Sequence, residues 1–360
     1  MTTRIAVAGV HGHGATHVRN AGLYGDLVAI ADPRPPDDVD VPVYPSLDEL
    51  LAATEVDVVI ISTPIQTHVP LAELAMRSGA DVLLEKPPTA SLAEFEYLSK
   101  VIEETGRVCQ VGFQAQASAA TLQLAHLMAD GGLGGIRGIS ATGKWLRKAG
   151  YFDRAPWAGR RTLNGIAVVD GAVTNPLAHS TAAALLLDGS TGVDDIRSVE
   201  TDLYRANDIE SDDTSTVRIT TTRGTSILIA VTLCAAEHVD PAVIVHGSRG
   251  RAVLHYTTDT LELPDGVQTL GRADLLQNLI EHRADPAVPL YCSFAATGGF
   301  TRVVEAIRLA DEPAVIPDAN VVWEGEGAER HPIVRDVEQW IDRASDELAL
   351  FKELGVPWVV

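Results

Sequence analysis

The chain has 360 residues, a length that suits two domains better than one small core. Hydrophobic residues make up 46% and charged residues 21% of the composition, which is typical of globular proteins. The formal net charge of −21 opposes binding to nucleic acid and to anionic lipid, and no apolar run is long enough to span a membrane.

The N-terminus and the cysteines predict the compartment. The chain starts with a strand-like run, Arg4 to Ala8, and shows no signal-peptide pattern. Cys109, Cys234 and Cys292 lie far apart and form no metal-type spacing. We therefore expect a cytoplasmic protein with buried, reduced thiols.

Residues 1–118 alternate short apolar strands with helical patterns. Ser46 and Ser91 are each followed three residues later by glutamate, which is typical of helix N-termini. This alternation predicts an α/β domain with a parallel, doubly wound sheet. The predicted strands end at Ala8, Ala31, Ser62, Leu84 and Val111.

The first strand runs into Gly9-Val10-His11-Gly12-His13-Gly14. A dinucleotide-binding turn follows the pattern G-x-G-x-x-G, and here His11 takes the place of the middle glycine, with Gly12 beside it. Asp32 ends the next strand, where an acid can bind a ribose 2′-hydroxyl, whereas Arg34 could meet a 2′-phosphate. NAD and NADP both stay open, and the alternative is an ordinary glycine turn in a flavodoxin-like sheet.

His11, His13 and His17 also raise the question of a metal site. His11 and His13 flank a glycine in the predicted turn, which is not the spacing of a helix face. Structural zinc would also need more ligands. We therefore predict no metal site.

Residues 119–360 show a different pattern, and we assign them to a second domain. Helical patterns flank a series of strands with period-2 alternation, which predicts an α+β domain with a large open, mostly antiparallel sheet. The C-terminal helix could instead pack back on the first domain. The segments are a helix at 119–130, a helix at 176–187, strands over 198–263, and helices at 299–310 and 332–354.

Three stretches at the predicted strand ends resemble the Gfo/Idh/MocA family of oxidoreductases. They are Ser62 to His68 (S-T-P-I-Q-T-H), Glu85-Lys86-Pro87, and Val111 to Gln114. The resemblance implies a Rossmann domain that binds NAD or NADP, with NAD slightly preferred. It also implies a second domain whose sheet covers the substrate and often forms a homodimer or homotetramer. The cofactor-binding residues that it implies are Gly9, His11, Gly12, His13, Asp32, Arg34, Ser62, Thr63, Pro64, His68, Glu85, Lys86 and Gln114.

The resemblance also implies catalytic residues. Lys86 follows a parallel strand, at the edge where ligands bind, and can stabilise negative charge on a reacting oxygen. The family's Asp-x-x-x-His motif matches Asn175 and His179, which at i, i+4 spacing would share a helix face. The other alignment uses Asp170 as the acid but loses the histidine, because Thr174 takes its place. His179 suits proton exchange, whereas Asn175 cannot act as a carboxylate does, so the usual proton relay is in question.

A basic and aromatic segment supplies the candidate substrate residues. The resemblance implies substrate contacts in the segment of Trp157, Arg160 and Arg161, and Lys144, Trp145 and Arg147 are similar candidates. Domain-interface packing remains an alternative for them. Asp170 is a further candidate substrate residue. Aromatic faces with guanidinium donors suit hydroxyl-rich ligands.

The predicted function is NAD(P)-dependent hydride transfer to or from a secondary alcohol or ketone of a sugar, polyol or glycoside. Two alternatives stay open. One is a cofactor-binding sensor or scaffold that has lost catalysis. The other is redox-assisted elimination, which the resemblance implies because some family members cleave glycosides in this way.

Overall fold

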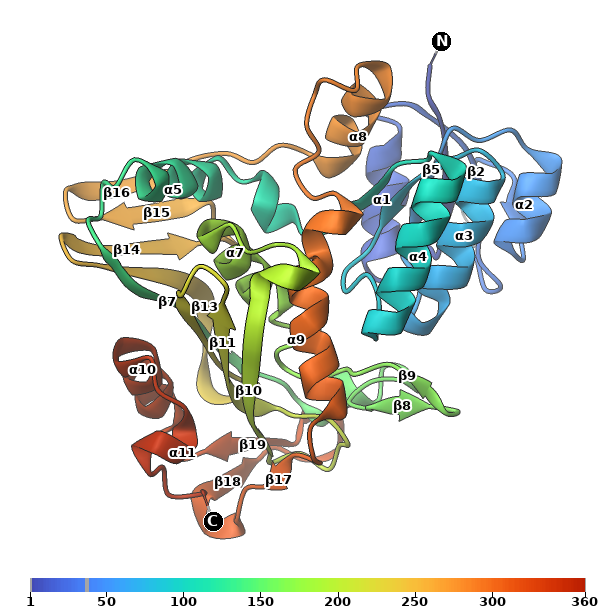
Figure 1. Ribbon diagram of the computed structural model, residues 1–360. Coiled ribbons are helices and arrows are strands. Elements are labelled where there is room, and N and C mark those ends of the chain that lie inside the picture. Colours follow the sequence, from blue (N-terminus) through green and yellow to red (C-terminus); the bar gives the residue numbers. More distant parts are fainter. Residues whose placement is uncertain (1, 36–38, 360) are drawn as a thin grey trace. The chain divides into compact units, whose positions relative to one another are not determined.

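The computed structural model describes residues 2–35 and 39–359, which form two compact units, each with its own sheet (Figure 1). Unit 1 comprises Met1–Ala117 and Ala273–Thr297. Unit 2 comprises Ser118–Arg272 and Gly298–Val360.

The sheet of unit 1 has the strand order β3-β2-β1-β4-β5-β6, and its neighbouring strands pair in parallel. The predicted doubly wound parallel sheet is therefore confirmed. From β1, the chain adds strands first on one side of the sheet and then, starting with β4, on the other. Sheets of this kind bind ligands at such a switch point, outside the carboxyl ends of the strands. The strands are β1 (Arg4–Ala8), β2 (Asp26–Ala31), β3 (Val43–Tyr44), β4 (Val58–Ile61), β5 (Asp81–Leu84) and β6 (Cys109–Val111).

Two helices of unit 1, α2 and α4, begin where the sequence predicts caps. The Ser46 hydroxyl accepts a hydrogen bond from the Glu49 N–H at 3.3 Å, and the Ser91 hydroxyl accepts one from the Glu94 N–H at 3.2 Å. Each bond satisfies a backbone donor that has no partner within its helix. The helices are α1 (His13–Ala21), α2 (Leu47–Ala53), α3 (His68–Arg77) and α4 (Leu92–Thr105), with short 3₁₀ turns η1 (Ile65–Thr67) and η2 (Gln114–Ala117).

A distant segment, residues 273–297, completes unit 1. The sequence analysis placed it in the second domain, but its apolar side chains belong to the core around β1. Leu275, Leu276 and Leu279 of α8 (Leu275–Ala284) are buried in one cluster with Ile5 and Val7. The 3₁₀ turn η4 (Phe294–Thr297) adds a Phe294 ring that stacks on Phe95, with 4.7 Å between the ring centroids.

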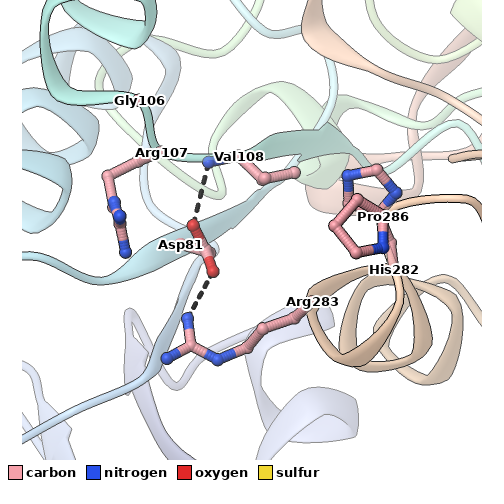
Figure 2. A pocket seen from close by; sticks show the side chains of 7 residues that line it. All are labelled: Asp81, Gly106, Arg107, Val108, His282, Arg283 and Pro286. Carbon is pink, nitrogen blue, oxygen red and sulfur yellow. Dashed lines mark hydrogen bonds and ion pairs between the residues drawn. The ribbon is translucent and has the colours of Figure 1, made fainter.

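A second anchor of this segment is visible in Figure 2. The guanidinium of Arg283, on α8, forms an ion pair with Asp81, which also accepts a hydrogen bond from the Val108 N–H at 2.9 Å. Arg283 pairs with Asp57 as well, at 3.1 Å. These groups border a pocket of about 360 Å³ at the amino ends of β5 and β6. Because open parallel sheets bind ligands at the opposite edge, we assign no function to this pocket.

The sheet of unit 2 has the order β16-β15-β14-β13-β7-β12-β11-β10-β17. Its pairs are antiparallel except for β12 with β7 and β10 with β17, so the predicted large, mostly antiparallel sheet is confirmed. Two short hairpins, β8–β9 and β18–β19, lie outside this sheet. The strands are β7 (Ile136–Leu146), β8 (Thr162–Leu163), β9 (Ile166–Ala167), β10 (Ile196–Arg205), β11 (Thr214–Thr221), β12 (Ser226–Thr232), β13 (Cys234–Gly247), β14 (Gly250–His255), β15 (Thr260–Leu263), β16 (Gly266–Thr269), β17 (Ala314–Val315), β18 (Val321–Glu324) and β19 (His331–Val334).

Two helices pack on opposite faces of β7 (Figure 1). A Cβ atom at Gly143 would collide with Leu177, just before α7, whereas one at Gly138 would collide with Leu348, just after α10. Residues an odd number apart in a strand point to opposite faces, so α7 and α10 cover different sides. The helices of unit 2 are α5 (Ala119–Ala129), α6 (Ala149–Phe152), α7 (Ala178–Asp188), α9 (Gly298–Leu309), α10 (Val337–Glu347) and α11 (Phe351–Leu354).

The C-terminal segment belongs to the core of unit 2. Val337, Ile341, Phe351 and Trp358 are buried in one cluster with Leu228 of β12. This corrects the alternative that the C-terminal helix packs on the first domain. The physical reason is that α10 and α11 present their apolar residues to a sheet face that would otherwise expose apolar side chains.

The three cysteines are free and buried, as predicted. Burial raises the pKa of Cys292 to about 12, so this thiol is protonated at neutral pH. Within residues 2–35 and 39–359, no helix has both the length and the apolar character needed to cross a membrane.

Candidate active site

The turn between β1 and α1 requires two of its glycines. Gly9 has φ +83°, and a Cβ atom there would collide with the carbonyl oxygen of Ser62. A Cβ atom at Gly14 would collide with the carbonyl oxygen of Gly9. Gly12, with φ +57°, precedes the first residue of α1 and has open space where its Cβ would lie. The turn therefore keeps the tight geometry of a dinucleotide-binding loop although His11 replaces the middle glycine.

Asp32 joins this turn to the end of β2. Its side chain is buried and accepts hydrogen bonds from the N–H of Val10 at 3.0 Å and of Arg34 at 2.8 Å. The His11 Nε2 atom lies 2.7 Å from the carbonyl oxygen of Arg34. The glycine turn after β1 therefore contacts the end of β2 through Val10 and through His11. A carboxylate fixed beside a glycine turn at the carboxyl edge of the sheet fits the ribose of a dinucleotide. The residues of unit 1 thus fit a nicotinamide cofactor.

His68 connects the two motifs that follow β4 and β5. It is 1% exposed, and its ring nitrogens lie 3.0 Å from the Pro87 carbonyl oxygen and 2.9 Å from that of Thr63. Burial lowers the pKa of His68. The Lys86–Pro87 peptide bond is cis. These contacts connect the two loops, including the one that carries Lys86, and the cofactor contact predicted for His68 stays a prediction.

Glu85 lies at the carboxyl end of β5 and faces two histidines of α1. One of its oxygens, Oε1, lies 2.9 Å from His17 Nε2 and 3.4 Å from His13 Nε2. Burial alone would raise the pKa of Glu85, but the hydrogen bond from His17 and the charges of His13, His17 and Lys86 outweigh it and lower the pKa to about 2. The Gln114 side-chain nitrogen lies 3.3 Å from His13 Nε2. His17 was not among the predicted site residues, although its position four residues after His13 was the available signal.

In unit 2, the loop before α7 brings Asp170 and Asn175 together. The Asn175 amide donates to Asp170 Oδ1 at 2.5 Å, and Asp170 Oδ2 accepts from the Gly159 N–H at 2.7 Å. Arg154 pairs with the same carboxylate at 3.4 Å. In one alignment of the family motif, Asp170 takes the acidic role. In the other, Asn175 takes the position of the family's aspartate. The structure places these residues in direct contact.

Asn175 does not share a helix face with His179, contrary to our prediction. α7 begins at Ala178, so Asn175 lies in the preceding turn and His179 in the first turn of the helix. Pro176 contributes to this boundary, because a proline disfavours the helical conformation of the residue before it, which is Asn175. The His179 ring lies 6.0 Å from the Tyr256 ring, centroid to centroid.

Aromatic and guanidinium groups alternate along residues 145–157, and we call them the aromatic–guanidinium ladder. The Arg147 guanidinium carbon lies 4.5 Å from the ring centroid of Trp145 and 5.0 Å from that of Tyr151. The Arg154 guanidinium carbon lies 3.6 Å from Tyr151 and 4.6 Å from Trp157. Trp157 was predicted as a substrate residue, but Arg154, which also holds Asp170, was not. The signal for Arg154 in the sequence was its position between two aromatic residues, Tyr151 and Trp157.

Two predicted substrate residues have structural partners within unit 2. The Arg161 guanidinium donates to four carbonyl oxygens at the end of α9, those of Ile307, Arg308, Ala310 and Asp311, at 2.7 to 3.0 Å. Lys144 forms an ion pair at 2.5 Å with Asp342 on α10, on the face of β7 opposite the one that meets Leu177. A sheet–helix interface therefore occupies Lys144. The Arg161 guanidinium is held at a helix end, but Arg161 also lines the cavity described next, so its substrate contact stays a prediction.

The remaining basic candidate, Arg160, is exposed and pairs with Glu210 at 2.7 Å. Both residues line a cavity of about 1080 Å³ in unit 2, whose wall is rich in charges of both signs. Its lining residues are Phe152, Asp153, Arg154, Ala155, Pro156, Ala158, Gly159, Arg160, Arg161, Thr162, Arg205, Asp208, Ile209, Glu210 and Glu312.

Comparison with known families decides the class of this protein. Residues 3–113 match the model described as an oxidoreductase family with an NAD-binding Rossmann fold, and residues 121–253 match the GFO/IDH/MocA C-terminal domain. The chain belongs to the Gfo/Idh/MocA family. It is an NAD-binding oxidoreductase, so the predicted family, fold class and enzyme class are confirmed.

The individual relatives have low sequence identity to this chain or match only part of it. Inositol 2-dehydrogenase of Rhizobium meliloti (strain 1021) is 24% identical over 274 residues, which cover 69% of this chain and 74% of that protein. UDP-N-acetylglucosamine 3-dehydrogenase of Acidithiobacillus ferrooxidans is 34% identical over 115 residues, or 30% of this chain and 36% of that protein. The WlbA dehydrogenase from Bordetella pertussis, solved in complex with NADH and UDP-GlcNAcA, has a similar fold, with a TM-score of 0.71 and 20% identity over 85% of this chain and 95% of that one.

Proposed function

We propose that this oxidoreductase transfers a hydride between a nicotinamide cofactor and a secondary alcohol or ketone of a sugar, polyol or glycoside. The observation that carries the proposal is the position of Lys86, two residues after the end of β5, at the ligand-binding edge of the parallel sheet. Two relatives support the substrate class, because they are named as dehydrogenases of inositol and of UDP-N-acetylglucosamine.

NAD is the cofactor that the charges of unit 1 favour. The glycine turn from Gly9 to Gly14 would hold the diphosphate, and Asp32 the ribose, while the residues after β4, β5 and β6 would frame the nicotinamide. A 2′-phosphate would bring negative charge against the buried Asp32, and Arg34, which is exposed, is the residue that would have to offset it. When bound, the nicotinamide supplies the hydride acceptor or donor.

Three side chains of the protein would act on the substrate. The Lys86 ammonium hydrogen-bonds the reacting oxygen and stabilises negative charge as it develops there. His179 takes the hydroxyl proton during oxidation and returns it during reduction. Asn175 would orient the substrate through its amide, which Asp170 holds in place.

Polar groups of unit 2 support a hydroxyl-rich substrate. Arg154, Trp157 and Arg160 combine guanidinium donors with an aromatic face beside the cavity of about 1080 Å³. A cavity with so many charged groups suits a sugar or polyol better than an apolar ligand.

The test is turnover of a panel of sugars and polyols with NAD⁺ and NADP⁺, monitored as formation of the reduced nicotinamide. We expect Lys86→Met to lower kcat by about 10²- to 10³-fold while NAD⁺ binding, measured by calorimetry, persists. The matched control is Lys148→Met, because Lys148 is an exposed lysine paired with Glu329. Full turnover by Lys86→Met would contradict the assigned role.

A sensor or scaffold that binds the cofactor without turnover is the second candidate, favoured by one observation. Asn175 offers an amide rather than a carboxylate, and its N–H group is already bound to Asp170. NAD⁺ binding without turnover of any compound in the panel would favour this candidate. Redox-assisted elimination would instead give cleavage of glycosides with no net change in the cofactor.

We also propose that copies of the chain associate through the sheet of unit 2. Its edge strand β16 is exposed along its length, including Val267, which is 66% exposed. Unpaired strand edges are ready-made association surfaces. Light scattering coupled to size-exclusion chromatography would report a dimer or tetramer, and a monomer at all concentrations would contradict this proposal.

A further inference from the structure

Three side chains of unit 1 converge in an arrangement that suits a metal ion. They are His13, His17 and Glu85, which we call the His–His–Glu cluster. One potential ligand atom from each residue lies within 4.8 Å of the other two. From the sequence, His11, His13 and His17 raised the question of a metal site and none was predicted; the fold brings His13 and His17 together with Glu85.

The backbone explains why the cluster forms. α1 begins at His13, so His13 and His17 are one helical turn apart and lie on the same face. Glu85 comes from the carboxyl end of β5, far away in the sequence. A helix face and a strand end therefore meet at three groups that can each provide one ligand.

The chemistry of the cluster matches known metal sites. Two imidazoles and a carboxylate, with an open position, form the ligand set of catalytic zinc sites and of non-haem iron sites. Ligands about 2.1 Å from a tetrahedral ion are about 3.4 Å from one another. The distances from Glu85 Oε1 to His17 Nε2 and His13 Nε2, 2.9 and 3.4 Å, require only small adjustments to reach this geometry.

The surroundings allow an ion to enter and help to hold the ligands. The His13 side chain is 50% exposed, whereas those of His17 and Glu85 are 15% and 11% exposed, so the cluster is accessible from one side. The second oxygen of Glu85 accepts a hydrogen bond from the Lys86 N–H at 3.1 Å, which fixes the carboxylate. The Gln114 amide, 3.3 Å from His13 Nε2, lies next to the position of a fourth ligand.

A simple hydrogen bond does not account for all three residues. The contact between His17 and Glu85 needs no third partner, yet His13 approaches the same carboxylate oxygen. In unit 2, His255 and Glu262 form an exposed pair with 2.9 Å between Nε2 and Oε1. That pair shows what a histidine–glutamate hydrogen bond looks like without a further histidine, and it provides a control.

We propose that His13, His17 and Glu85 bind one divalent transition-metal ion, with Zn²⁺ favoured by the ligand types. The ion would connect the first turn of α1 to the end of β5, beside the glycine turn and one residue from Lys86. This inference does not depend on the proposed function, because binding is measured with the metal alone, in the absence of cofactor and substrate.

The test is titration of the full-length protein, first stripped with a chelator, with Co²⁺ as a spectroscopic probe and Zn²⁺ as its competitor. We expect one equivalent of Co²⁺ to give the strong visible absorption of a four- or five-coordinate ion, and Zn²⁺ to abolish it. His13→Asn, His17→Asn and Glu85→Gln should each weaken binding at least about tenfold. His255→Asn should leave the absorption and the affinity unchanged.

A thermal shift separates loss of ligands from loss of fold. Zn²⁺ should raise the Tm of the wild-type protein and of His255→Asn, but not that of folded variants of the cluster, because only ligands that bind the native state stabilise it. Absence of the Co²⁺ absorption in the wild-type protein would overturn the proposal. Equal affinity in the wild type and in His17→Asn, or loss of binding in His255→Asn, would overturn it as well.

Discussion

At the scale of single residues, the contact between Asn175 and Asp170 explains why an amide is compatible with position 175. The Asp170 carboxylate accepts a hydrogen bond from the Gly159 N–H and forms an ion pair with Arg154. The Asn175 amide adds a third donor at 2.5 Å. A carboxylate has only acceptors when it is ionised, so it requires donors around it. An aspartate at position 175 would place a second negative charge where Asp170 needs a donor.

Asn175→Asp tests this account. We expect the substitution to lower the free energy of unfolding by at least about 2 kcal/mol at pH 7, because a hydrogen bond to a buried charge is replaced by repulsion between two carboxylates. The exchanged pair Asp170→Asn/Asn175→Asp should recover most of the loss. Urea unfolding of both variants provides the measurement. A single variant as stable as the wild type would show that the contact contributes little.

Asp212 carries a second residue-scale prediction, for the pH dependence of stability. It is fully buried beside Gly171 and accepts a hydrogen bond from the Ser215 hydroxyl at 2.8 Å. Burial raises its pKa to about 6. The folded state thus holds the proton more tightly than the unfolded chain, where the pKa is about 3.9.

Stability from this group is therefore complete below about pH 4 and lost as the pH rises through about 6. A shift of about two pKa units corresponds to about 3 kcal/mol. Asp212→Asn, which resembles the protonated side chain, should flatten the decline in unfolding free energy between pH 4 and pH 6, measured by urea unfolding. The neighbouring Asp213 is also buried and its pKa is raised, so part of the slope should remain. An unchanged slope in Asp212→Asn would contradict the assignment.

At the scale of elements, Arg161 is important because it closes the end of α9. The last carbonyl groups of a helix have no partners within it. One guanidinium here binds two of them, those of Ile307 and Arg308, and the carbonyl groups of Ala310 and Asp311 just after the helix. The planar, five-donor guanidinium suits this task better than an ammonium does.

Arg161→Ala should therefore destabilise the protein by about 1–2 kcal/mol with little change in KM for the substrate. Arg160→Ala is the matched control, because Arg160 is exposed and its pair with Glu210 contributes at most about 1 kcal/mol. We expect Arg160→Ala to raise KM and leave the Tm nearly unchanged. A thermal melt and a substrate titration of both variants distinguish the two roles, and the reverse pattern would assign Arg161 to the substrate site.

The elements that the sequence predicts well are those with local signals. The parallel sheet of unit 1, the caps at Ser46 and Ser91, and the Gly9 turn all follow from patterns within a few residues. The helix predicted at 176–187 begins two residues later, at Ala178, so Asn175 lies outside it.

Long-range pairings were not predictable in the same way. Nothing near Arg161 in the sequence indicates the end of α9, and nothing near Lys144 indicates Asp342. The side chains of Glu85 and His17 likewise meet only because β5 and β1 belong to one sheet, where β4 alone separates them. Residue types can therefore suggest a candidate site, but partners from distant elements determine whether a charged side chain is available to a ligand.

At the scale of the whole molecule, unit 1 is built from two separate pieces of chain. Residues 273–297 bury Leu275, Leu276 and Leu279 in its core and add the Arg283 ion pairs. Each buried leucine contributes about 1.5–3 kcal/mol, so their removal would cost as much as a large part of a domain's stability.

A fragment of residues 1–117 should consequently fail to unfold cooperatively, whereas the same fragment joined by a flexible linker to residues 273–297 should do so. Circular dichroism during thermal unfolding is the measurement, with NAD⁺ binding as a second readout. If the short fragment melts as cooperatively as the joined one, the segment is an accessory to the fold of unit 1.

The same arrangement has a consequence for synthesis on the ribosome. The N-terminal unit cannot assemble its complete core until residue 297 has emerged, because Leu275, Leu276 and Leu279 come late in the chain. Most domains fold as units in the order of their synthesis, with the N-terminal one first. In this protein, the first domain to be translated must wait, with apolar surface near β1 uncovered, until most of the second has already been made.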